Sequence, residues 1–335
     1  MTRPNKLERW VTSVCDDQQV FARIEELHFF ANGVFSNVYK GRLVSANNQT
    51  IVLKKTWTKG PVSLKEVVIL SELSKFNHPN IIQLLYLFKS TNHPDNRVCY
   101  GLIFEYMPIT LYKHMRQFRT QGRTLNLIDV KLYAWQLFRA QAHLARHNVC
   151  HRDIKPQNIL IIEPGARNNC YQITRYYRPP ELLLRATKYG TEADVWSCGC
   201  VFGELLRGRS FLHGQTSSHQ LELIVCELGM PTDLDYRAMR CPNRVHEFED
   251  MPIFPGKFRN LLPQAPEEAL HLLSRILIYN PSNRLYGSEL LADRFFDDIF
   301  TPGATRTNGQ AVTILSREDR QRALGREVAV AEINN

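Results

Sequence analysis

Alternating apolar positions in the first part of the chain predict a set of short β-strands. Residues 28–44 (HFFANGVFSNVYKGRLV) and 50–57 (TIVLKKTW) carry β-branched and aromatic residues at alternate positions, and a polar turn separates them. The apolar runs 81–88 (IIQLLYLF) and 98–107 (VCYGLIFEYM) are also typical of strands. A helix is predicted from Pro61 to Ser74, because the first turn of a helix tolerates proline. This part of the chain should therefore form a β-rich unit with one helix.

After Met107 the apolar positions follow a helical period instead. The helix predicted over residues 125–147 should lay one face on a core, with apolar positions at Leu127, Val130, Ala134, Leu137 and Leu144. Further helices are predicted at Thr191–Leu206, His219–Leu228 and Pro266–Tyr279. From Thr301 onward the sequence is polar, and we expect a flexible tail with one short helix. The predicted fold class is thus α+β, with a small β-rich lobe followed by a large helical lobe.

Composition and charge narrow the function classes. The 335 residues are 44% hydrophobic and 22% charged, which is typical of a globular protein with a substantial core. The net charge is +9, but the lysines and arginines are scattered and no run of four occurs. We therefore expect no nucleic-acid partner, and a phosphate-bearing substrate explains the charge equally well.

Cysteine spacing and hydropathy indicate the compartment. The eight cysteines show no repeated paired spacing, and the one close pair, Cys198 and Cys200, is too tight for a zinc knuckle. The longest uncharged apolar stretches fall well short of a membrane span, and the chain begins without an apolar signal region. We expect reduced thiols, no membrane contact and a cytoplasmic or nuclear location, while the oligomeric state cannot be predicted.

The segment HRDIKPQN (151–158) carries the clearest candidate chemistry. Asp153 is a candidate general base for an acceptor hydroxyl, Lys155 can reach the γ-phosphate of ATP, and Asn158 can offer an oxygen to Mg²⁺. A chance surface tripeptide His-Arg-Asp is the alternative, and the full eight residues after a long helix make it the weaker one. The predicted catalytic residues are therefore Asp153, Lys155 and Asn158, with Asn158 also as the metal ligand.

A lysine in a strand and a carboxylate on the following helix form the second candidate group. Lys54 can place its ammonium on the α- and β-phosphates if Glu66, twelve residues later, orients it. Two solvated surface charges are the alternative interpretation. The turn before this strand resembles a thinned glycine loop, in which Gly33 remains and Val38 would cover the adenine.

These motifs give the chain a family resemblance. From about His28 to Phe300 it resembles a eukaryotic protein kinase domain, and three stretches are similar to glycogen synthase kinase-3 of the CMGC group: VKLYAWQLFRAQAHLARHNVCHRDIKPQNIL, TRYYRPPELLLRATKYGTEADVWSCGCVFGELL and LELIVCELGMPT. The resemblance implies the two-lobed kinase fold. The domains it implies are an N-terminal extension (1–26), an N-lobe (27–106), a C-lobe (107–300) and a flexible tail (301–335).

The resemblance also assigns roles to single residues. It implies a gatekeeper at Phe104 and backbone contacts to adenine at Glu105 and Met107. It further implies that Glu181 pairs with Arg284 and that Asp194 braces the catalytic loop, which are structural roles. Basic residues for a priming phosphate would be Lys65 and Arg152, and the regulatory tyrosine would be Tyr171.

One part of the family pattern is missing. No aspartate occurs between Asp153 and Asp194, and no Asp-Phe-Gly, whose aspartate is the family's principal Mg²⁺ ligand, occurs anywhere in the chain. Glu163 is the remaining carboxylate in the gap after Asn158 and lies on the wrong side of it. In addition, Val52 replaces the usual alanine of the adenine slot and adds bulk there. Since both flanks of the gap are intact, the pattern is typical of one excised segment.

Two functions follow from this pattern. The first is a protein serine/threonine kinase with ATP and Mg²⁺ as cofactors and proteins as substrates, weakly active or inactive in this form. The second is a pseudokinase that binds partners as a scaffold. Retention of the whole set of lysine, glutamate, aspartate and asparagine favours the first, and loss of Asp-Phe-Gly favours the second.

Overall fold

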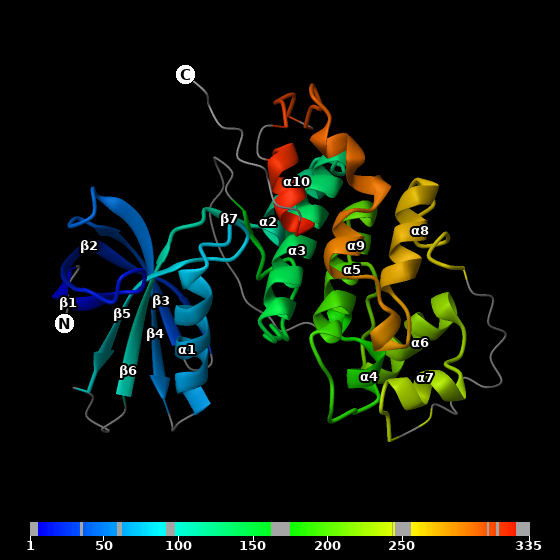
Figure 1. Ribbon diagram of the computed structural model, residues 1–335, viewed down its shortest axis with the longest axis horizontal. Helices are drawn as coiled ribbons and strands as arrows, with labels where there is room; N and C mark the ends of the chain where they lie inside the picture. The colour runs from blue at the N-terminus through cyan, green and yellow to red at the C-terminus, as the bar shows by residue number, and fades with distance from the viewer. Residues whose placement is uncertain are drawn as a thin grey trace. The chain divides into compact units, whose positions relative to one another are not determined.

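The computed structural model describes residues 6–33, 36–58, 62–91, 98–161, 175–242, 244, 256–306, 308–312 and 315–325. Contacts within the chain divide it into two compact units (Figure 1). Unit 1 comprises Met1–Ile109 and Leu160–Gln172, and unit 2 comprises Thr110–Ile159 and Ile173–Asn335. A β-rich unit and a helical unit are what the hydrophobic pattern predicts.

Unit 1 is built on a closed six-stranded barrel of antiparallel neighbours in the order β1-β2-β3-β4-β6-β5. Its strands are β1 (Leu7–Ser13), β2 (Gln19–Asn32), β3 (Ser36–Leu43), β4 (Gln49–Thr58), β5 (Leu84–Ser90) and β6 (Val98–Glu105). The strands β1 and most of β2 lie before His28, where the sequence indicated only an extension. The barrel therefore takes in a segment that was not expected to belong to it.

Two apolar clusters hold unit 1 together. The first fills the barrel and includes Ile24, Ile51, Leu53 and Ile103, none of which is accessible to solvent. The second lies between the outer face of the sheet and α1 (Val62–Lys75), which packs against β4 and β5 (Figure 1). Because side chains alternate along a strand, β6 supplies Ile103 to the first cluster and Leu102 and Phe104 to the second.

Unit 2 is helical around a single large core. Its helices are α2 (Leu111–Thr120), α3 (Leu127–Arg146), α4 (Pro180–Leu183), α5 (Glu192–Arg207), α6 (Ser217–Leu228), α7 (Asp233–Ala238), α8 (Glu267–Ile276), α9 (Gly287–Leu291) and α10 (Arg317–Ala323), with 3₁₀ turns η1 (Arg175–Tyr177), η2 (Pro281–Asn283) and η3 (Arg294–Phe300). The short strands β7 (Ile109–Thr110) and β8 (Leu160–Ile161) pair where the chain passes between the units.

The central helices α3 and α5 form because their sequences supply both a core face and defined ends. Asn126 caps α3 by accepting a hydrogen bond from the Asp129 amide at 2.8 Å. Trp135 and Phe138 of α3 are buried, and α3 packs against α5 (Figure 1). At the C-terminal end of α5, Gly208 terminates the helix in the left-handed conformation (φ 73°) that glycine adopts without strain.

The segment after Phe300 packs on unit 2, in contrast to the expected flexible tail. Arg306 Nε lies 2.8 Å from Asp129 Oδ1 at the start of α3, and both side chains are nearly buried. Leu315 and Ala323 are buried in the helical core, and Ser316 begins α10 with a capping box. The short helix expected here is present. Apolar anchors among the polar residues therefore fix the described part of 301–325.

Among the described residues, no helix combines the length and the apolar character needed to cross a bilayer. The cysteines that the structure describes are all unpaired.

Candidate active site

Lys54 and Glu66 come together in unit 1. Lys54 lies on the central strand β4, and its neighbours Ile51 and Leu53 point into the barrel. By alternation Lys54 points outward to α1, where its Nζ lies 2.5 Å from Glu66 Oε1. The side chains are 30% and 47% exposed, so the pair contributes little to stability. Its effect is to hold an ammonium at a fixed place on the sheet.

The residues predicted to surround adenine share this face of the sheet. Val38 of β3 is the cross-strand partner of Lys54, and directly opposite residues point to the same side. Phe104 is likewise the partner of Val52, and it packs into the cluster beneath α1. The added methyl groups of Val52 therefore lie beside the predicted gatekeeper.

The turn between β2 and β3 is tight at its one glycine. The Gly33 amide donates to Ser36 O at 2.7 Å, and a Cβ at Gly33 would lie 2.9 Å from Ser36 Oγ. A larger residue at position 33 would thus require Ser36 to move. Val34 and Phe35 lie outside the described residues.

The chain leaves regular structure at the predicted adenine contacts. Strand β6 ends at Glu105, which is exposed, and residues 106–108 belong to no strand or helix. The backbone of Met107 is therefore outside the sheet ladder.

Asp153, Lys155 and Asn158 form one cluster in unit 2. Asn158 Nδ2 donates to the backbone oxygen of Asp153 at 2.8 Å and to its Oδ2 at 2.7 Å. Lys155 Nζ lies 2.9 Å from Asp153 Oδ1, and the lysine side chain is 1% exposed whereas the aspartate is 47% exposed. A buried ammonium needs a charged partner, so Lys155 holds the Asp153 carboxylate in place while one side of that carboxylate faces solvent.

Asp194 braces the loop that carries this cluster, as predicted. Its Oδ2 accepts a hydrogen bond from the His151 amide at 2.5 Å, and its Oδ1 accepts one from the Arg152 amide at 2.9 Å. Asp194 is buried in the first turn of α5. Arg152 has a φ of 68°, which costs energy for a residue with a side chain, and the two hydrogen bonds offset that strain.

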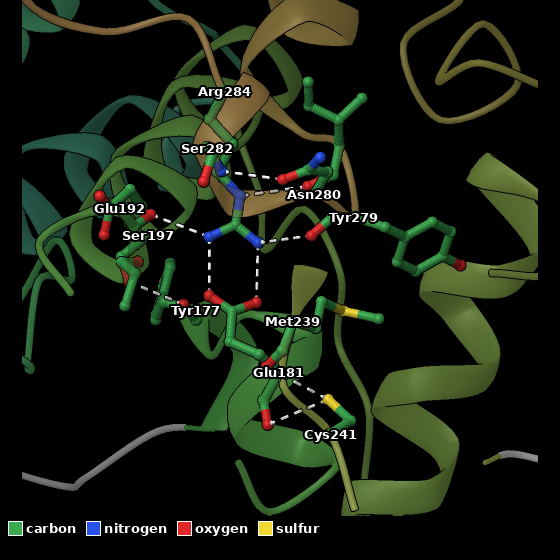
Figure 2. A network of polar contacts seen from close by, with 12 residues as sticks. Tyr177, Glu181, Glu192, Ser197, Met239, Cys241, Tyr279, Asn280, Ser282 and Arg284 are labelled. Carbon is green, nitrogen blue, oxygen red and sulfur yellow. Dashed lines mark hydrogen bonds and ion pairs between the residues drawn. The ribbon is translucent and has the colours of Figure 1, made fainter. Parts of the chain in front are cut away.

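Glu181 and Arg284 form the predicted ion pair, and Figure 2 shows that it is bidentate. Arg284 Nη1 and Nη2 lie 2.7 Å from Glu181 Oε1 and Oε2, and both side chains are buried. The same guanidinium donates to the backbone oxygens of Tyr279 and Glu192 (Figure 2). It also donates to the backbone oxygen of Ile278. One arginine thus joins α4 to the start of α5 and to the turn after α8.

Sequence reasoning missed the buried pair of Tyr177 and Glu204. Tyr177 Oη donates to Glu204 Oε2 at 2.5 Å, and the Tyr177 backbone oxygen accepts from Ser197 Oγ at 2.8 Å (Figure 2 shows the latter contact). Burial raises the pKa of Glu204, although the tyrosine hydrogen bond opposes the shift. A single carboxylate inside the apolar run CGCVFGELL was the available signal, because such a group needs a buried partner.

The remaining predicted residues divide between the units. Lys65 is exposed on α1 in unit 1, and Arg152 is exposed in unit 2, where its guanidinium lies 5.6 Å from the centre of the Tyr189 ring. Tyr171 and Glu163 lie outside the described residues. The structure thus assembles two groups of site residues, Lys54 with Glu66 in unit 1 and Asp153 with Lys155 and Asn158 in unit 2.

The predicted site residues offer few oxygen ligands for a magnesium ion. Mg²⁺ in kinases takes carboxylate, phosphate and water oxygens in near-octahedral geometry. Among the described residues, no group of three or more His, Cys, Asp or Glu side chains could hold a metal ion. Asn158 Oδ1 is one suitable oxygen, but Lys155 and Asn158 already engage the Asp153 carboxylate. The donor set therefore fits the ion incompletely.

Comparison with known proteins agrees with this geometry. The family model described as the protein kinase domain matches residues 24–296. The chain is also 35% identical over 288 residues to a protein named glycogen synthase kinase 1 from Pyricularia oryzae, covering 81% of this chain and 72% of that relative.

Proposed function

We propose a function on the premise that this chain belongs to the protein kinase family and is a relative of the glycogen synthase kinases. The proposed function is that of a serine/threonine kinase that slowly transfers the γ-phosphate of ATP to protein hydroxyls. The observation that carries the proposal is the cluster of Asp153, Lys155 and Asn158 held by Asp194. A lineage that only binds partners has no physical need for that arrangement.

Each residue has a part in the proposed transfer. Asp153 accepts the proton of the serine or threonine hydroxyl as its oxygen forms a bond to the γ-phosphorus. The bond from that phosphorus to the β,γ-bridging oxygen breaks, and ADP leaves. Lys155 offsets charge on the transferred group, while Lys54, oriented by Glu66, holds the α- and β-phosphates.

Slow transfer follows from the missing Asp-Phe-Gly. A bound Mg²⁺ would supply charge neutralisation at the phosphates, and Asn158 is the one predicted ligand for it in this chain. Because the donors fit the ion incompletely, we derive no step through the metal. Loss of one such stabilising group lowers rates by roughly 10²–10³-fold in other enzymes, and we expect at least that deficit here.

Phosphate transfer to a peptide tests the proposal directly. The full chain is incubated with radiolabelled ATP, Mg²⁺ and a serine-containing peptide, beside the Asp153→Asn variant. We expect a slow signal that the variant abolishes, because an amide cannot accept the hydroxyl proton. Equal signals from both proteins would mean that a contaminating kinase causes the transfer, and the proposal would fall.

A pseudokinase scaffold is the second candidate, and the absence of Asp-Phe-Gly favours it. Melting temperatures with and without ATP separate the two functions. Stabilisation by ATP that Lys54→Met removes supports the kinase, since the ammonium would hold phosphates. Neither transfer nor stabilisation by ATP would favour the scaffold.

A further inference from the structure

A surface pocket of about 490 Å³ lies under α10 on the helical unit. Asp297 and Phe300 of η3, with Thr301 just after it, form one side of the pocket. Arg317 and Arg320 of α10 form another side. The pocket thus lies at the contact that fastens the last described helix to its unit.

The pocket carries a net positive charge. Arg317 and Arg320 are its two cationic lining residues, and Asp297 is the one anionic residue among them. Arg320 Nη2 lies 2.5 Å from Asp297 Oδ1, and its guanidinium lies 5.1 Å from the centre of the Phe300 ring. Arg317 is exposed at the same pocket. Because two guanidinium groups face one carboxylate, one positive charge in the pocket is not neutralised and could bind a further anion.

Thr301 can supply that anion if it is phosphorylated. Its side chain is exposed, and its backbone is extended with φ −85° and ψ 130°. Pro302 follows it and favours this extended conformation. No other serine or threonine in the chain is followed by proline. The Thr301 backbone oxygen accepts from the Ala304 amide at 3.2 Å in a surface turn, and Thr301 Oγ donates to the Asp297 backbone oxygen at 3.3 Å. Both contacts are on the surface, so another kinase can break them to bring the exposed hydroxyl into its active site.

We propose that Thr301 is a phosphorylation site for a separate, proline-directed serine/threonine kinase, and that Arg317 and Arg320 bind the phosphate. Thr301 Oγ forms a bond to the γ-phosphorus of ATP, and the bond to the β,γ-bridging oxygen breaks to give ADP. The hydroxyl proton passes to the catalytic base of the modifying kinase. The proposal does not depend on whether this chain is itself an active kinase.

The phosphate strengthens the attachment of α10. It brings a charge of about −1.5 to −2, and arginine binds phosphate with paired, charge-assisted hydrogen bonds. Arg320 would turn from Asp297 to the phosphate, and Asp297 is exposed enough to be solvated instead. Repulsion by Asp297 and by the end of η3 opposes this gain, but two guanidinium groups outweigh it.

Phosphorylation of the full chain followed by hydrogen exchange tests the proposal. The chain is treated with a purified proline-directed kinase and Mg-ATP, with a sample lacking that kinase as control. We expect one phosphate on Thr301 and amide exchange in residues 320–325 that is about tenfold slower, as one charge-assisted hydrogen bond would give. Thr301→Val should take up no phosphate and should melt like the native chain.

Variants of the two arginines show whether they bind the phosphate. Arg317→Gln with Arg320→Gln should accept the phosphate without any slowing of exchange. Arg317→Gln alone keeps the contact of Arg320 with Asp297, so it serves as a milder variant that folds and should show part of the slowing. The proposal is overturned if Thr301 stays unmodified, if exchange in α10 does not slow, or if it slows equally without the arginines.

Discussion

At the scale of single residues, Glu204 shows how a buried carboxylate links stability to pH. It is 5% exposed in α5, and burial raises its pKa above the ordinary glutamate value of 4.5. The folded protein therefore binds a proton at Glu204 more strongly than the unfolded chain does. By linkage this stabilises the fold at low pH, and the contribution is lost as the pH rises from 4.5 through the raised pKa.

Replacement of Glu204 by glutamine should flatten that pH dependence. The amide does not titrate, yet its oxygen can still accept the hydrogen bond from Tyr177. The melting temperature of Glu204→Gln should therefore fall less than that of the native chain as the pH is raised above 4.5. Glu289→Gln changes an exposed carboxylate and serves as the control. Parallel melting curves for native and Glu204→Gln proteins would contradict the assignment.

Removal of the Asp153 charge should also affect the fold. Asp153→Asn leaves the buried ammonium of Lys155 without its 2.9 Å ionic partner. Because Asp153 is half exposed, we expect a loss of only about 1–2 kcal/mol in the free energy of unfolding, below the range for fully buried pairs. Urea denaturation measures it, and Asp153→Asn with Lys155→Met should recover most of the loss. A double variant less stable than the single one would argue against this pairing.

At the scale of elements, the pair of Arg284 and Glu181 ties three segments together. It joins α4, which follows the missing segment, to α5 and to the turn after α8. Arg284→Ala should reduce the free energy of unfolding by about 3–5 kcal/mol, because Glu181 would remain buried without its partner. Arg275→Ala breaks a surface pair, with side chains 43% and 12% exposed, and should cost under about 1 kcal/mol. Urea denaturation compares them, and similar losses would refute a special role for Arg284.

The sequence predicted some elements well for a physical reason. Residues 125–147 keep a helical apolar period over several turns, and α3 forms at Leu127–Arg146. The pairing of Lys54 with Glu66 was also predicted, because a strand followed by a helix brings these positions together. The roles of Asp194, Glu181 and Arg284 came from the family resemblance, since no local pattern joins residues so far apart in the chain.

Strand β1 was not predicted because its inward-facing positions are not all apolar. Its outer face carries Trp10, while an inward position holds Arg9, so alternation of apolar and polar residues is weak. The Arg9 guanidinium stacks 3.9 Å from the centre of the Phe88 ring and donates to Lys89 O at 3.1 Å. Those contacts come from a distant strand and cannot be read locally. The packing of the tail was likewise not predicted, although its short helix was, and the capping box from Ser316 to Asp319 marks where that helix begins.

At the scale of the whole molecule, the chain combines a retained catalytic loop with a missing metal ligand. The family match runs from residue 24 to residue 296 and includes parts of both units, so the missing Asp-Phe-Gly falls inside the matched region. An experiment can determine whether the missing segment or the thinned glycine loop limits the rate of phosphate transfer.

Restoring the segment should restore activity. Insertion between Asn169 and Cys170 of an Asp-Phe-Gly segment from an active relative should raise phosphate transfer by at least roughly 10²-fold, because it returns a carboxylate ligand for Mg²⁺. A matched insertion with Asn in place of the new Asp should give no gain. If neither insertion helps, the glycine loop or Val52 limits the rate, and Val52→Ala becomes the next variant.

The closed barrel has a consequence for self-association. Residues Thr12 and Ser13 of β1 pair with Leu87 and Tyr86 of β5, so each of the six strands has a neighbour on both sides. Open sheet edges present unpaired amides and carbonyls on which other chains can add strands. Removal of Leu7–Ser13 would uncover such edges on β2 and β5. By pairing with both β2 and β5, strand β1 leaves no open edge in the barrel at which another chain could add a strand.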